Sequence, residues 1–258
     1  MSVRVCVLGS GSKGNSTWVA TEKTRLLIDA GFSMRETCAR LSLCGERLET
    51  CTAIVISHEH IDHVAGLKRM ARDLKCPVYL TAATREAISW GVKEPPCELI
   101  EAGKKFAIGD FEISPFTIPH DAAEPVAFTL EAEGIKAGIV TDLGCIPGHV
   151  KEHVRRCNCL IFESNHDLEM LKVGPYPWHV KQRVMGRHGH LSNLTTAEFL
   201  CGEYDAAGQV LVLAHLSETN NHPELARLSA IEALERRGGG VPELHLASQS
   251  APTKVFTW

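Results

Sequence analysis

A cluster of metal-binding side chains directly after an apolar stretch constrains this chain more than any other feature of its sequence. Residues 53–57 form a short apolar segment, which predicts a strand buried on both faces. The six residues that follow contain His58, His60, Asp62 and His63. His58 and His60 point the same way if the chain is extended there, because side chains on a strand repeat every two residues. Neutral imidazole and carboxylate together suit Zn, Mn or Fe, so the cluster predicts a metal site.

The bulk composition predicts an ordinary soluble protein of the cytoplasm. The chain has 258 residues, of which 44% are hydrophobic and 22% are charged. We expect a single domain over residues 1–258, with no membrane partner, because no apolar run approaches the roughly 20 residues of a membrane-spanning helix. The first residues lack the apolar core of a signal peptide. The ten cysteines contain no C-x-x-C pair and are expected to be reduced thiols.

The order of apolar and polar residues predicts a layered α/β fold. A helix is expected from about residue 62 to 74, where apolar residues recur on one face. The other expected helices cover residues 149–156, 195–203 and 223–237, and the expected strands cover residues 3–8, 17–20, 25–29, 53–57, 78–80, 111–118, 126–130, 137–141, 159–163 and 210–214. Strands separated by helices in this way predict sheets that helices cover.

Two familiar motifs occur near the N-terminus without the context that they need. Gly9, Gly11 and Gly14 have the spacing of a dinucleotide-binding loop, but the following residues are β-branched and aromatic and cannot open the required helix. Ser10 and Lys13 have the spacing of a serine β-lactamase nucleophile, but its partner motifs are absent. Both are interpreted as coincidence, and the glycine-rich segment as a turn between two strands.

The order of the metal-binding residues resembles the metallo-β-lactamase superfamily. Its pattern His-x-His-x-Asp-His is present at residues 58–63, and the further landmarks of that superfamily follow at Asp29, His120, Asp142 and His215. The resemblance implies a metallo-β-lactamase αββα sandwich, in which helices cover two mixed sheets. It also implies two divalent metal ions, Zn, Mn or Fe, and a hydroxide that bridges them.

The resemblance further implies a role for each landmark residue. The first ion would be held by His58, His60 and His120, and the second by Asp62, His63 and His215. Asp142 would be shared between the ions, Asp62 would also take part in catalysis, and Asp29 would brace the metal loop from behind.

Several loop motifs resemble the YycJ/WalJ group of bacterial exonucleases within that superfamily. These are residues 10–16, 163–167, 174–177 and 189–193. The resemblance implies that His190 lies by the scissile phosphate, where it would stabilise charge or protonate the leaving oxygen, and that Glu163 orients it. The plainer alternative is that both are polar residues at a strand end or a helix cap.

One stretch of the chain is basic although the formal net charge is −4. No Asp or Glu occurs from residue 171 to 197, and the basic strip Lys172, Lys181, Arg183 and Arg187 lies there, interleaved with Tyr176 and Trp178. This asymmetry predicts contacts with the phosphates and bases of a nucleic acid, most simply DNA. An ordinary solvated helix face is the alternative. Ser12, Lys13 and Asn15 in the glycine-rich loop are further candidates for phosphate contacts.

The leading functional prediction is a two-metal phosphodiesterase that degrades DNA from 5′ to 3′. Two divalent ions can attack a carbonyl as readily as a phosphorus, so the metals alone do not choose the substrate. A small-molecule phosphodiesterase and a thioesterase or lactamase therefore remain as alternatives. The carbonyl hydrolases give no use for His190 or for the basic strip.

Overall fold

The structure is a computed structural model that describes residues 2–91 and 94–258. The chain forms two compact units. The first unit comprises residues up to 117, 122–135 and 248–258, and the second comprises residues 118–121 and 136–247. Whether both belong to one domain over residues 1–258, as expected from the sequence, stays a prediction.

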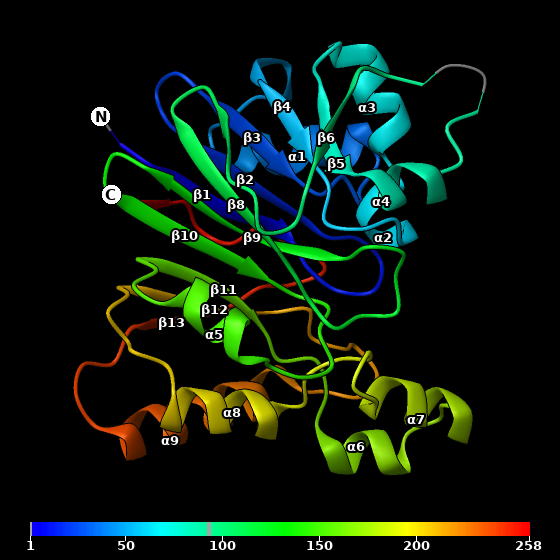
Figure 1. The fold of residues 1–258 in the computed structure, drawn as a ribbon. Coiled ribbons are helices and arrows are strands. Elements are labelled where there is room, and N and C mark those ends of the chain that lie inside the picture. The colour runs from blue at the N-terminus through cyan, green and yellow to red at the C-terminus, as the bar shows by residue number, and fades with distance from the viewer. Residues whose placement is uncertain (1, 92–93) are drawn as a thin grey trace. The chain divides into compact units, whose positions relative to one another are not determined.

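A mixed sheet forms the centre of the first unit (Figure 1). Its order is β14 (Phe256–Thr257), β1 (Arg4–Gly9), β2 (Ser16–Ala20), β3 (Arg25–Ile28), β4 (Ala53–Val55), β5 (Val78–Thr81) and β6 (Cys97–Ile100). The strands from β14 to β3 pair antiparallel, and those from β3 to β6 pair parallel. The glycine-rich loop joins β1 to β2, as the sequence predicts, and no helix follows it.

Helices of the first unit bury one face of this sheet. They are α1 (Met34–Leu43), α2 (Ile61–Val64), α3 (Leu67–Leu74) and α4 (Ala82–Ala87), with a 3₁₀ turn, η1 (Leu48–Thr50). Leu41 of α1 and Leu67 and Met70 of α3 pack with Trp18 and Ile54 of the sheet in one apolar core. Three further strands pair antiparallel in the order β7 (Phe106–Ile108), β8 (Phe111–Thr117) and β9 (Val126–Ala132).

The expectation of one continuous helix from residue 62 to 74 is wrong. The chain forms α2 and α3 with a break at Ala65 and Gly66. Gly66 donates its N–H to Ala30 O, and a Cβ there would lie 1.9 Å from Phe32 O. The helix breaks because the chain must lie against the backbone that follows β3, and only glycine allows so close an approach.

Parallel strands form the centre of the second unit. They pair in the order β10 (Ile135–Val140), β11 (Cys159–Glu163), β12 (Val210–Ala214) and β13 (Glu243–Leu246). The helices are α5 (Gly148–Val154), α6 (Leu168–Val173), α7 (Trp178–Met185), α8 (Asn193–Gly202) and α9 (Pro223–Arg237). Figure 1 shows α8 and α9 side by side, and Phe199 of α8 stacks on Phe162 of β11 with ring centroids 4.9 Å apart.

The long regular elements agree with the sequence prediction and several short ones do not. The expected bounds of β11, β12 and α9 are confirmed. The short or amphipathic elements α1, α4, α6, α7, β6, β7, β13 and β14 were not predicted. Within the described ranges no helix has the length and apolar character needed to cross a bilayer.

Candidate metal centre and active site

The first unit presents its metal-binding loop at the carboxyl ends of two parallel strands. Asp29 directly follows β3, and the segment from His58 follows β4, its parallel neighbour. Polar side chains gather at such an edge because the ends of parallel strands meet there. Asp29 has φ of 60°, a left-handed conformation that is unusual for a residue other than glycine. Backbone strain of this kind is concentrated at functional sites.

The backbone of the metal-binding loop is fixed by neighbouring segments. Asn15 donates its N–H to Asp62 O at 2.7 Å, and Ala30 donates its N–H to His63 O at 2.8 Å. Gly31 lies against the same loop, since a Cβ there would be 1.7 Å from Asp62 O. Contacts with Asn15, Ala30 and Gly31 therefore hold the backbone of the loop in the observed conformation.

Asp29 lies against His63, and its expected role of bracing the metal loop stays a prediction. Its Oδ2 lies 2.8 Å from His63 Nδ1, and both groups are buried. Because a carboxylate only accepts hydrogen bonds, Nδ1 carries the proton, and Nε2, which lies 3.1 Å from Asn15 Nδ2, carries the lone pair that a metal ligand needs. Ser57, which was not singled out from the sequence, donates its hydroxyl to Asp29 and lies 3.0 Å from His58 Nδ1. Its place directly before His58 was the only signal.

Asn15 contacts the metal-binding loop, and its expected role as a phosphate donor stays a prediction. The side chain is buried, its Nδ2 donates to Asp62 Oδ2 at 3.0 Å, and its Oδ1 accepts from Ser10 Oγ and Gly11 N–H. Ser12 and Lys13 of the same loop are exposed.

Three imidazoles lie close together in the loop. The ring centroids of His58 and His60 are 4.6 Å apart, and those of His58 and His63 are 4.1 Å apart. His58 and His63 are fully buried, and the carboxylate of Asp62 is 3.5 Å from His63 Nε2. Buried polar groups at this density are costly to fold unless something binds them, and nitrogen and carboxylate donors together fit a transition-metal ion.

The second unit brings three ionisable residues to the carboxyl edge of its parallel strands. Asp142 lies just beyond β10, Glu163 ends β11, and His215 directly follows β12. All three are buried, and Asp142 and His215 have positive φ, 64° and 56°. As at Asp29, the strained backbone coincides with the candidate site.

Asp142, Glu163, His190 and His215 form a compact cluster whose ligand atoms all lie within 4.8 Å of one another. His215 Nε2 is 3.2 Å from Asp142 Oδ1, and His120 Nε2 is 4.0 Å from the same oxygen. The rings of His190 and His215 stack with centroids 5.0 Å apart. The cluster therefore contains the donors of a metal site and a further histidine, His190, beside them.

Glu163 is a buried carboxylate that holds His190. Its Oε1 lies 2.8 Å from His190 Nδ1 and 3.2 Å from His215 Nδ1, and its Oε2 accepts the N–H groups of Leu143 and Leu191. Burial favours the neutral acid, but attraction to His190 and the hydrogen bonds from both histidines outweigh it and hold the pKa of Glu163 at about 2. Glu163 is therefore ionised at neutral pH and fixes the N–H of His190 on Nδ1.

His120 is buried and neutral. Burial lowers its pKa more strongly than the nearby carboxylate of Asp142 raises it. Its Nδ1 lies 3.3 Å from Gly189 O, so Nε2 points toward Asp142. Asn165, which sequence reasoning missed, lies 3.2 Å from His215 Nδ1 and donates to His215 O.

The four cations of the basic strip do not form one exposed surface. Lys181 was expected to contact phosphate; it is buried, and its ammonium donates to Lys172 O at the end of α6. Lys172 pairs with Glu169 and Arg183 with Asp121, while Arg187 is exposed. The strip was predicted from the sequence of one segment, and these acidic partners lie outside that segment.

Comparison with known proteins identifies relatives of the whole chain. Residues 24–216 match the beta-lactamase superfamily domain family. The chain is 35% identical to exodeoxyribonuclease YycJ of Bacillus anthracis, with 99% of each chain covered. It is 32% identical to exodeoxyribonuclease WalJ of Streptococcus pneumoniae, with 91% of this chain and 89% of that protein covered.

Solved structures agree with these relatives on the fold. The metallo-β-lactamase fold protein YhfI of Bacillus subtilis matches with a TM-score of 0.74 at 17% identity, covering 100% of this chain and 99% of the other. Zn²⁺-bound PqqB of Methylobacterium extorquens matches with a TM-score of 0.73 at 16% identity, covering 97% and 99%. The expected fold, two mixed sheets flanked by helices, is confirmed.

Proposed function

This chain belongs to the beta-lactamase superfamily, and we propose from that membership and from its two side-chain clusters that it is a metal-dependent DNA exonuclease. Two relatives named exodeoxyribonuclease support DNA as the substrate, since each aligns with most of this chain. Degradation from 5′ to 3′ is part of the proposal because the loop motifs of the sequence imply it by resemblance. The ten cysteines lie in the described part of the chain and none forms a disulfide, which suits the cytoplasm.

Seven side chains are the proposed ligands of two divalent ions, and both units contribute to one hydrolase domain. The first ion is assigned to His58, His60 and His120, the second to Asp62, His63 and His215, and Asp142 is shared. The buried imidazoles and carboxylates of each unit fit Zn, Mn or Fe. Ions bound here would supply a water nucleophile at neutral pH and offset the negative charge of the phosphate.

Other side chains are proposed to orient the ligands and to transfer protons. Asp29 and Ser57 are positioning residues that orient His63 and His58. Asp62, held by Asn15, is proposed to accept a proton from the attacking water as well as to bind. Nε2 of His190 is left for the proposed substrate; when the ring is protonated both nitrogens carry hydrogen, and Nε2 would then donate a hydrogen bond to the phosphate or a proton to the leaving oxygen.

The pair of Glu163 and His190 is the single observation that carries the choice of a phosphodiester. Two metal ions can promote attack of water on carbonyl and phosphorus centres alike, so a preference for a phosphodiester must come from other groups. An ionised, buried carboxylate 2.8 Å from a part-exposed imidazole is built to stabilise or protonate an oxygen that gains negative charge. A thioesterase or lactamase has no evident use for this pair.

A panel of substrates tests the proposal. Purified protein with added Mn²⁺ or Zn²⁺ is incubated with linear DNA, a small chromogenic phosphodiester, a thioester and a β-lactam. We expect metal-dependent release of nucleotides from DNA and no turnover of the last two. Hydrolysis of the small ester with intact DNA would instead indicate a small-molecule phosphodiesterase. Turnover of the thioester or the lactam would indicate a carbonyl hydrolase.

Further DNA contacts are proposed at the exposed residues Ser12, Lys13 and Arg187, and at Lys172 and Arg183 if phosphate displaces their acidic partners. Lys181 is left out, because its ammonium is bound to Lys172 O.

A further inference from the structure

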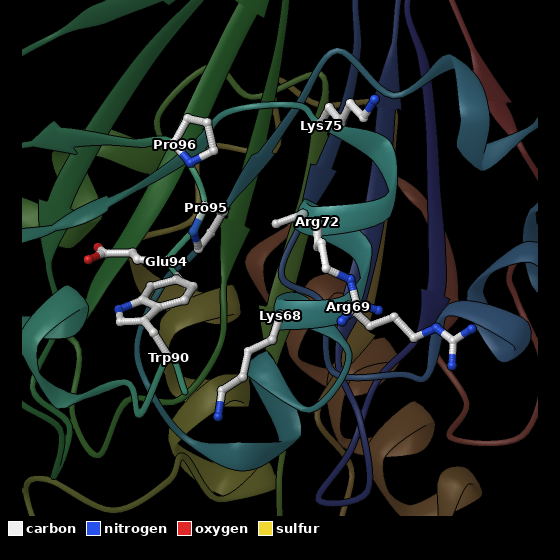
Figure 2. Close-up of a pocket in the computed structure, with 9 residues that line it drawn as sticks. Lys68, Arg69, Arg72, Lys75, Trp90, Glu94, Pro95 and Pro96 are labelled. Carbon is white, nitrogen blue, oxygen red and sulfur yellow. The ribbon is translucent and has the colours of Figure 1, made fainter. Parts of the chain in front are cut away.

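A basic groove of about 1010 Å³ lies on the first unit along α3, outside the metal-binding loop. Its nine lining residues are Lys68, Arg69, Ala71, Arg72, Lys75, Trp90, Glu94, Pro95 and Pro96. Figure 2 shows the cations of α3 along one side of the groove and Trp90 with the two prolines along the other. The four cations are exposed on the helix face opposite the buried Leu67 and Met70.

The positive charge of this groove is only partly neutralised. Arg69 and Arg72 share one carboxylate, Asp73, at 3.3 and 2.9 Å. Lys68 and Lys75 form no ion pair with any described residue. The one acidic residue of the lining, Glu94, is itself paired with Arg85. In a protein of formal net charge −4, the groove is therefore a local excess of positive charge.

The dipole of α3 does not favour all four of these cations. Arg72 and Lys75 lie at the carboxyl end of α3, where a positive charge interacts well with the helix dipole. Lys68 and Arg69 lie in its first turn, where the same charge is unfavourable. Arg69 offsets part of this cost through its ion pair with Asp73 four residues on, whereas Lys68 forms no such pair with a described residue, so helix stability does not account for the charge at Lys68.

The opposite wall supplies an aromatic surface. Trp90 is half-buried and its indole Nε1 donates to Arg85 O at 3.0 Å, which fixes the orientation of the ring. An aromatic ring beside a line of cations is the combination that binds single-stranded nucleic acid, because bases stack on rings while cations contact phosphates.

We propose that this groove binds the backbone of the DNA strand that the enzyme degrades, with Trp90 stacking on a base. The inference rests on the proposed nuclease function and adds a strand-binding site to it. Lys68 is five residues beyond His63, so one wall of the groove belongs to the chain segment that directly follows the metal-binding loop. The eight residues of α3 span about 12 Å, the length of three to four nucleotides of a strand that keeps the stacked spacing of roughly 3.4 Å.

The double variant Lys68→Glu/Lys75→Glu tests the groove, since both lysines are exposed and free of ion pairs with described residues. The probe is a short single-stranded phosphorothioate oligonucleotide, which binds without being degraded, and its affinity is measured over a range of salt concentrations. We expect affinity to fall about tenfold or more and the slope of log affinity against log salt to shrink by roughly 1.4, about 0.7 for each lost phosphate contact. Hydrolysis of the small chromogenic phosphodiester should stay unchanged.

The matched control is Arg47→Glu/Lys104→Glu, which changes the net charge equally at two exposed positions of the same unit. This control should bind the oligonucleotide as the wild type does. Equal weakening in both doubles would overturn the proposal, because net charge alone would then explain binding. Unchanged binding in the groove double would overturn it as well.

A second measurement does not depend on charge reversal. The oligonucleotide should quench tryptophan fluorescence of the wild type, and Trp90→Phe should lose most of that quenching. Quenching that survives the substitution would remove Trp90 from the site. The proposed function fails separately, when the wild type degrades no DNA in the presence of metal. The groove alone fails when DNA is degraded and the groove double has unchanged affinity for it.

Discussion

Glu163 Oε1 lies 2.8 Å from His190 Nδ1, although the two residues are 27 positions apart in the sequence. The carboxylate is fully buried, and attraction to His190 and hydrogen bonds from both histidines hold its pKa at about 2, so it accepts a hydrogen bond from His190 Nδ1 throughout the neutral range. The opposite ring nitrogen is thereby kept for the substrate. In the proposed function His215 binds metal and His190 assists the reaction, and these two roles can be tested apart.

His190→Ala should retain its metal ions and lose turnover of DNA. A residue that acts only in the transition state changes the rate without changing metal affinity, and proton transfer is worth about 10²–10⁴-fold. Metal analysis and turnover are measured on the same sample. His188→Ala, an exposed neighbour, is the control and should be fully active. Loss of metal would make His190 a ligand, and full activity would remove it from the site.

Asp142→Asn should impair both metal positions at once. A carboxylate shared by two ions cannot be replaced by an amide without weakening each, so metal content should fall from about two ions per chain to below one. Elemental analysis of the purified variant checks this. Full occupancy with unaltered activity would contradict the shared role of Asp142.

Gly31→Ala should distort the metal-binding loop. The added Cβ would lie 1.7 Å from Asp62 O and 2.5 Å from Asn15 N, and these backbone atoms cannot move aside cheaply. We expect a loss of about 3 kcal/mol in unfolding free energy and weaker metal binding. Gly148→Ala, which meets nothing within 4 Å, is the matched control and should not destabilise the protein. Normal stability and metal content in Gly31→Ala would show that the loop is not held there.

His166 should make the protein sensitive to acid. Burial lowers its pKa to about 4, from an ordinary value of 6.5. As pH falls below about 6.5, His166 becomes protonated in the unfolded chain, but in the folded chain it stays neutral until about pH 4. The free energy of unfolding therefore falls across this window, by roughly 3 kcal/mol in total. His166→Leu should lose less stability between about pH 7 and pH 4.5 in urea unfolding, whereas His179→Leu on the surface should behave as the wild type. Parallel curves for the wild type and His166→Leu would contradict this account.

The sequence predicts the parts of the site that depend on local order. His58, Asp142, Glu163 and His215 each lie at or just beyond the carboxyl end of a strand, and a strand end can be recognised from its own residues. The bounds of β11, β12 and α9 were accessible for the same reason, since each is regular and ends at clear signals.

Contacts between distant segments could not be read from the sequence. Asn15 looked like a loop donor because its partner Asp62 is 47 residues away, and Lys181 looked like a phosphate contact because its partner is a backbone carbonyl. The break before α3 depends on Phe32 O, which only the folded chain brings close to Gly66. Contacts between segments distant in sequence or with the backbone therefore determine the environment of Asn15, the burial of Lys181 and the break before α3.

Degradation of linear and covalently closed circular DNA, with Mn²⁺ or Zn²⁺ present, tests whether the protein is a metal-dependent DNA exonuclease. We expect that a linear strand labelled at its 5′ end releases labelled mononucleotide from the first turnover, that closed circles remain intact, and that a chelator stops the reaction. Intact linear DNA under every metal condition, or cleavage of closed circles at the same rate, would contradict the proposed function.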